Sequence, residues 1–89
     1  FTGEEHRVTM RFANHLAGAV IDRFGRETQL TAADDAHFTV CVPVAVSPQF
    51  FAWLFGFGTE AELLAPASVR QQLQALAAAV AAQYAAPAP

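Results

Sequence analysis

The chain has 89 residues, of which 54% are hydrophobic and only 15% are charged, whereas roughly a quarter of the residues in a soluble domain usually carry charge. This length allows one small domain, and so few charges indicate either a rich core or an apolar surface that meets a partner. All five basic residues are arginines and the net charge is −3. This composition argues against a free-standing binder of duplex DNA, because phosphate neutralisation normally supplies most of the affinity.

Other features bear on the location of the protein. The single cysteine, Cys41, cannot form an internal disulfide, which is typical of a reducing compartment. No apolar stretch approaches the ~18 residues of a membrane span, and no signal peptide is visible. We therefore expect a cytoplasmic protein with no membrane partner. Because the chain opens with Phe1 rather than methionine, we also expect it to be a piece of a longer protein.

The first half of the chain is predicted to form a strand, a helix and a second strand. Residues 6–12 alternate apolar and polar side chains, which indicates a half-buried strand. Asn14 can cap a helix over residues 16–24, which Gly25 ends. A short strand is expected over residues 28–32.

The second half repeats this order and adds a helix. Residues 37–44 alternate again and predict a strand. Ser47 and Pro48 predict the start of a helix over residues 49–55, because a hydroxyl cap followed by proline favours the first turn. The other predicted elements are a strand over residues 60–64 and a helix that begins at Pro66 and Ser68 and carries an apolar stripe of Val69, Leu73, Leu76, Val80 and Tyr84.

This β-α-β-β-α-β order predicts an α+β, ferredoxin-like sandwich. Such a fold has a four-stranded antiparallel sheet with two helices on one face. The extra C-terminal helix must pack on an edge of the sheet, on a neighbouring domain or on a second copy of the chain. We expect residues 1–5 to be a linker, residues 6–84 the domain and residues 85–89 a disordered tail.

The outward side chains of two predicted strands suggest an anion site. Arg7 and Arg11 share a strand face about 13 Å apart, and His37 points outward from another strand. Together they could contact an anionic effector, or they could be ordinary solvated side chains. An open sheet of this kind can bind single-stranded nucleic acid. The RNA-recognition version, however, stacks bases on exposed aromatic residues, which these outward positions lack.

We find no pattern that predicts a metal, a cofactor or catalysis. His37 and Cys41 lie about 13 Å apart along their strand, too far to share a zinc ion bound at about 2.0–2.3 Å. Ser47 and Ser68 both stand where helix caps are expected. No nucleophile elbow or phosphate-binding glycine loop is visible, so the protein is not expected to be an enzyme.

The helix over residues 49–55 bears two aromatic stripes. One stripe holds Phe51, Leu54 and Phe55. Because one sheet covers only one stripe, the other stripe either completes a deep core or forms an interface, where buried Trp and Phe anchors dominate association. The predicted interface joins that second stripe to the last helix and consists of Phe50, Trp53, Phe57, Leu76, Val80 and Tyr84.

Three stretches of the chain carry a family resemblance. Residues 8–12 read Val-Thr-Met-Arg-Phe. Residues 53–58 read Trp-Leu-Phe-Gly-Phe-Gly and are followed by Ala-Glu-Leu-Leu-Ala-Pro at 61–66, and a closing helix over residues 69–84 begins Val-Arg-Gln-Gln-Leu. In this order and spacing they resemble the WCX family, the C-terminal extension of WYL-type bacterial transcription regulators. The chain departs from the family pattern in its extra aromatic residues, Phe50, Phe51 and Phe55.

The resemblance implies a function for the chain as part of a larger protein. Such regulators carry an N-terminal winged helix-turn-helix and a WYL domain, which is an SH3-like barrel thought to bind an effector. The extension would be a non-catalytic module that helps dimerisation and effector sensing. Its implied partners are a second copy, the WYL domain of the same chain and an anionic effector, with DNA contacted only through the missing N-terminal domain. The alternative is a stand-alone ferredoxin-like sensor domain that binds a small molecule.

Overall fold

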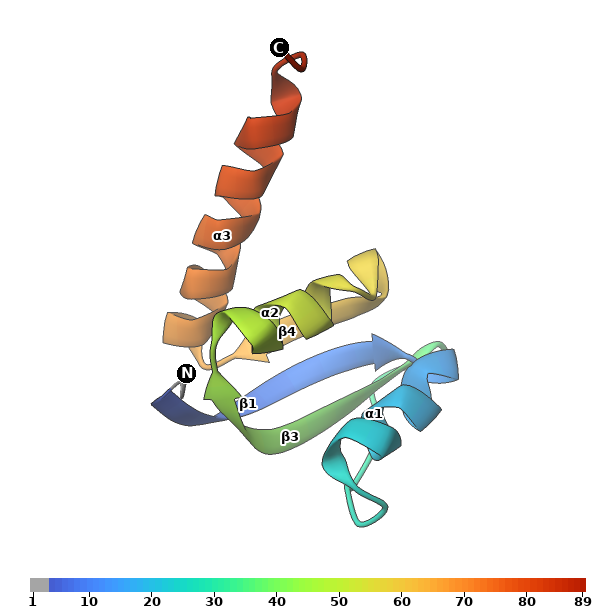
Figure 1. The fold of residues 1–89 in the computed structure, drawn as a ribbon. Coiled ribbons are helices and arrows are strands. Elements are labelled where there is room, and N and C mark those ends of the chain that lie inside the picture. Colours follow the sequence, from blue (N-terminus) through green and yellow to red (C-terminus); the bar gives the residue numbers. More distant parts are fainter. Residues whose placement is uncertain (1–3) are drawn as a thin grey trace.

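The sheet is built around two long central strands (Figure 1). The computed structural model describes residues 4–89. Strand β1 (Glu4–Ala13) pairs antiparallel along its whole length with β3 (His37–Val46). Strand β4 (Ala61–Ala65) pairs antiparallel with the other side of β1, and β2 (Thr31–Ala32) pairs antiparallel with β3. The order β2-β3-β1-β4 is that of the predicted ferredoxin-like sheet, and the α+β fold class is confirmed.

The strands differ in length from the prediction. Both β1 and β3 have 10 residues, so Glu4 and Glu5 extend the first strand into the predicted linker, whose residues 1–3 lie outside the described part of the chain. Strand β2 is shorter than the predicted 28–32 because the Thr28 N–H donates a hydrogen bond to the Gly25 carbonyl over 3.1 Å. That turn keeps residue 28 out of the ladder with β3.

Two short helices cover one face of the sheet. A 3-10 turn (Asn14–Leu16) leads into α1 (Ala17–Phe24), and α2 (Pro48–Phe55) is followed by a second such turn (Gly58–Glu60). The Ser47 hydroxyl accepts a hydrogen bond from the Phe50 N–H, which confirms the predicted cap. Asn14 does not cap a helix, because its amide donates instead to the Asp35 carbonyl over 3.0 Å.

A single apolar core lies between this face and the two helices. Even-numbered side chains point into it from Val8 to Phe12 on β1 and from Phe38 to Val44 on β3, as their alternation predicts. No polar side chain in residues 4–89 is buried. The buried residues are Val8, Met10, Phe12, Val20, Phe38, Val40, Val42, Val44, Phe50, Phe51, Leu54, Leu63 and Val69.

The last helix, α3 (Ala67–Ala85), packs on the domain only through its beginning. Val69 is buried and Leu73 is half-buried, whereas residues 74–89 are all exposed. In Figure 1 the helix starts beside the end of β4 and projects away from the sheet. The radius of gyration is therefore 14.0 Å, against about 12 Å for a compact chain of this length. Ser68 does not cap α3, because the helix begins directly after Pro66.

Candidate interaction surfaces

The outer face of the sheet, opposite the core, carries the predicted anion site. Because Val8, Met10 and Phe12 point inward, Arg7 and Arg11 point outward on β1. Their cross-strand neighbours on β3 are Pro43 and Thr39, and His37 lies opposite Ala13 at the far end of this face. The structure thus brings the three predicted residues to one face.

Two of these three side chains already bind carboxylates. Arg11 forms an ion pair with Glu62, its neighbour on β4. The His37 Nδ1 lies 2.8 Å from the Asp34 carboxylate, and this hydrogen bond is the main reason that the pKa of Asp34 is lowered. Arg7 is exposed, and within the described residues no carboxylate is found to pair with it. The face therefore offers an anion one available guanidinium, that of Arg7.

Glu62 is shared between the sheet and α3. Arg70 of α3 donates a hydrogen bond to the second carboxylate oxygen of Glu62 over 2.7 Å and another to the Leu63 carbonyl over 2.8 Å. The hydrogen bond from Arg70, supported by the nearby charge of Arg11, lowers the pKa of Glu62 despite partial desolvation. The carboxylate therefore stays ionised between the two guanidinium groups, which ties the start of α3 to β4.

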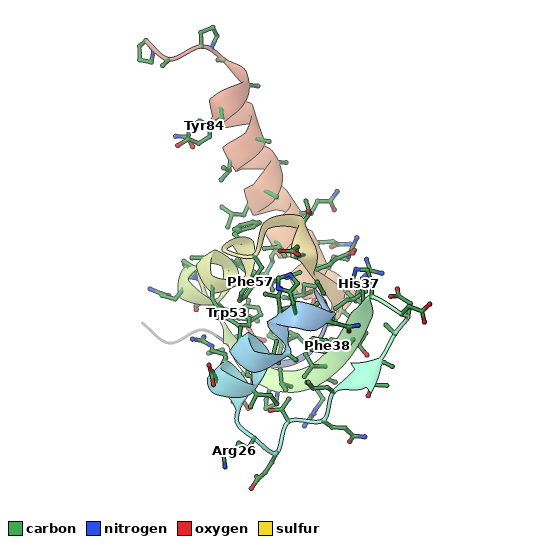
Figure 2. The ribbon with its side chains drawn as sticks, turned by 90° about the vertical axis from the view of Figure 1, so that its right-hand side faces the viewer. Arg26, His37, Phe38, Trp53, Phe57 and Tyr84 are labelled. Atoms are coloured by element: carbon green, nitrogen blue, oxygen red, sulfur yellow. The ribbon has the colours of Figure 1, made fainter. Side chains whose placement is uncertain are left out.

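An aromatic cluster joins α1, α2 and β1 around Trp53. The Trp53 ring makes edge contacts with Phe57 and Phe24 at centroid distances of 5.0 and 5.6 Å, and it contacts Phe12 at 6.0 Å. The guanidinium of Arg23 lies 5.3 Å from the Trp53 ring centre, a favourable cation–π distance. Figure 2 shows Trp53 and Phe57 within the body of the domain, far from Tyr84.

The phase of α2 differs from the prediction. Phe50 is only 1% exposed and packs in the core, which matches the deep-core alternative for its stripe rather than the predicted interface. Phe51 and Leu54 are buried beside it, whereas Phe55 is 41% exposed. The core side of α2 is centred between Phe50 and Leu54, and Phe55 lies about 100° away from Leu54 because successive helical residues are rotated by that angle. Sequence reasoning missed this exposed aromatic residue, because α2 is almost wholly apolar and its periodicity does not set which side faces the sheet.

An apolar groove runs from Phe55 along α3. One hollow of about 350 Å³ is lined by Phe55, Ala77, Val80 and Ala81. A second hollow of about 300 Å³ is also lined by Phe55 and Ala77. It extends to Leu63 of β4 and Arg70 of α3. We call the surface formed by Phe55, Leu73, Ala77, Val80 and Ala81 the α3 groove. Of the predicted interface residues, Val80 lines this groove, while Leu76 and Tyr84 are exposed on the same helix.

Metal-ligating side chains and long apolar helices bear on two further kinds of site. Within residues 4–89, no three His, Cys, Asp or Glu side chains gather closely enough to hold a metal ion. None of the helices formed by these residues combines the length and apolar character needed to cross a membrane.

Comparison with known proteins gives one match. The family model described as WCX domain matches residues 4–81, from the first residue of β1 to near the end of α3. No curated protein and no solved structure matches the chain.

Proposed function

The chain belongs to the WCX domain family, and on this premise we propose that it is a non-catalytic regulatory and assembly module of a WYL-type bacterial transcription regulator. In this role it joins two copies of the regulator and contacts an anionic effector together with the WYL domain. Reading of DNA is left to another part of the full protein, in keeping with the net charge of −3.

The observation that carries the assembly role is the excess of exposed surface. The chain exposes 5956 Å², whereas a compact monomer of 9.5 kDa exposes about 5,050 Å². The excess of about 900 Å² is close to the ~800 Å² that each partner contributes to a standard protein interface. Most of the excess surface belongs to the part of α3 that projects from the domain. This location favours self-association through α3.

Sedimentation equilibrium of the chain over a wide concentration range tests this role. We expect the apparent mass to rise from one to two chains as the concentration increases. A strict monomer at about 1 mM would mean that association is weaker than about 4 kcal/mol, and the assembly role would then be withdrawn.

The effector role rests on Arg7, the available cation of the outer sheet face. We expect a short single-stranded oligonucleotide, used as an anionic probe, to bind this face with an affinity that falls as salt is added, because phosphate contacts release counterions. Arg7→Ala should weaken binding, whereas Arg26→Ala should not. Arg26 is the matched control because it carries the same charge in the turn that follows α1, outside the strands of the sheet (Figure 2). Equal losses of affinity in both variants would indicate a general charge effect and would contradict an anion site at Arg7.

A further inference from the structure

The apolar side of α3 continues beyond the domain to which it docks. Its larger apolar residues are three or four positions apart and therefore share one side of the helix. Val69 is buried in the core, but the exposed fraction of the later side chains rises from 38% at Leu76 to 43% at Val80 and 78% at Tyr84. The surface that anchors the helix is thus continuous with an exposed apolar stripe.

Phe55 stands where this stripe leaves the domain. It projects from α2 and, with Ala77, Val80 and Ala81, lines the apolar hollow of about 350 Å³. The two alanines keep the α3 surface low on that side, so that a second helix can approach closely. The groove is therefore an apolar binding surface next to the exposed ring of Phe55.

The chemistry of the groove restricts what can occupy it. Arg70 is the last charged residue of the chain, and residues 71–89 carry none. A partner that placed charged side chains in the hollow lined by Phe55, Ala77, Val80 and Ala81 would bury them without a counter-charge, which is costly. The α3 of a second copy meets the requirement, because its exposed side is equally free of charge, and the surface excess of about 900 Å² matches what one partner contributes to a standard interface.

We propose that the α3 groove binds the α3 of a second copy in antiparallel orientation. The two helices cross near Val80, and Tyr84 of each copy lies beside Phe55 of the other. This inference rests on the proposed assembly role and specifies its partner surface. The contact is reciprocal and closes on itself, as a two-fold dimer requires.

The positions along the helix favour the antiparallel orientation. Leu76 and Tyr84 lie four residues before and after Val80, which is about 6 Å in each direction at 1.5 Å per residue. An antiparallel crossing at Val80 places Tyr84 of one copy at the level of Leu76 and Phe55 of the other. A parallel pair would set the two Tyr84 side chains together, away from both domains. Opposed helix dipoles also favour the antiparallel pair.

Disulfide cross-linking tests this arrangement directly. Cys41 is exposed and is first replaced by serine, and Leu76→Cys, Val80→Cys and Tyr84→Cys are then made separately. A disulfide needs Cα atoms within about 4.4–6.8 Å. In the antiparallel pair the two residues at position 80 meet, whereas those at position 76 lie about 12 Å apart along the axis, as do those at position 84. We therefore expect Val80→Cys alone to cross-link, and Leu76→Cys to cross-link only when mixed with Tyr84→Cys.

The other outcomes separate this inference from the proposed function. Cross-linking of each of the three variants with itself would show a parallel pair and overturn the inference. A dimer in sedimentation with no cross-link in any variant would place the interface elsewhere, which overturns the inference but leaves the assembly role. A monomer before and after substitution would overturn both.

A pair of charge substitutions provides a second test with a matched control. Val80→Asp puts two carboxylates at the crossing point, and we expect dimer affinity to fall at least about 100-fold, as burial of unpaired charge requires. Ala82→Asp introduces the same charge about 200° around the helix from Val80 and should leave the dimer intact. Both residues are exposed in the single chain, so the Trp53 fluorescence of each variant should remain that of a folded domain. Equal affinities in the two variants would contradict the inference.

Discussion

Arg70 of α3 and Glu62 of β4 form an ion pair over 2.7 Å, and the same Arg70 nitrogen donates to the Leu63 carbonyl over 2.8 Å. The second contact occupies a backbone acceptor on the outer side of an edge strand, which otherwise invites pairing with another chain. Together with buried Val69, these contacts fix the start of α3 against the sheet. The direction in which the exposed remainder of the helix projects is therefore determined by the domain.

The first prediction concerns the stability that Glu62 contributes. Glu62→Gln removes the charge that Arg70 and Arg11 share. Because all three side chains are more than a third exposed, solvent screens the pairs, and we expect the free energy of unfolding to fall by only about 0.5–1 kcal/mol. Urea denaturation measures this change. Glu27→Gln, at an exposed site, should give almost none, and an equal loss there would mean that the effect is not specific to the pair.

The second prediction concerns the pH dependence of the same pair. The hydrogen bond from Arg70 lowers the pKa of Glu62 from 4.5, so folding favours the ionised carboxylate. The stabilisation is complete above the pKa of the unfolded chain and is lost as the pH falls through the lower pKa of the folded protein. The stability difference between the wild type and Glu62→Gln should therefore be constant near pH 7 and shrink as the pH falls below 4.5. Denaturation curves over this range check it, and a difference that grew with acid would reverse the assignment.

The third prediction separates a core phenylalanine from a surface one. Phe50→Ala should cost about 3–5 kcal/mol of stability, because this side chain is buried and its removal leaves a cavity. Phe55→Ala should cost less than about 1 kcal/mol in the monomer, because Phe55 is largely exposed, but it should weaken self-association. Denaturation at low protein concentration and sedimentation at high concentration measure the two effects. Similar stability losses in both variants would contradict the phase of α2.

The fourth prediction concerns the projecting half of α3. A chain that ends after residue 74 keeps Val69 and Leu73, the residues that pack on the domain. We expect it to fold, as judged by circular dichroism and Trp53 fluorescence, and to remain monomeric in sedimentation. A truncated chain that still dimerised would place the interface outside α3, and one that failed to fold would show that the distal helix supports the core.

Much of the fold could be predicted because its signals are local. The alternation in β1 and β3 fixes which side chains face the core. The start of α2 is set by Ser47, which caps the Phe50 N–H three residues later, and by Pro48 in the first turn. Boundaries were less accurate where a competing contact intervened. Thr28 bonds back to Gly25, and Asn14 reaches the Asp35 carbonyl 21 residues away instead of capping a helix.

The sites depended more strongly on contacts between distant parts of the chain. Arg11 was predicted as an anion contact, but its partner Glu62 lies 51 residues later and meets it only because β4 pairs with β1. The exposure of Phe55 depends on the angle at which α2 lies on the sheet, which short-range periodicity does not set for an almost wholly apolar helix.

The sequence by itself determined the α+β class, the order of the elements, the inward faces of the long strands and the apolar stripe of α3. These features follow from periodicity and capping, which act over a few residues. Only the tertiary structure decided which side of α2 is buried, which arginine of the outer face is available and how much of α3 its own domain covers. These properties depend on pairing and packing between segments far apart in the chain, because burial is decided by what lies opposite a side chain rather than by its neighbours in sequence.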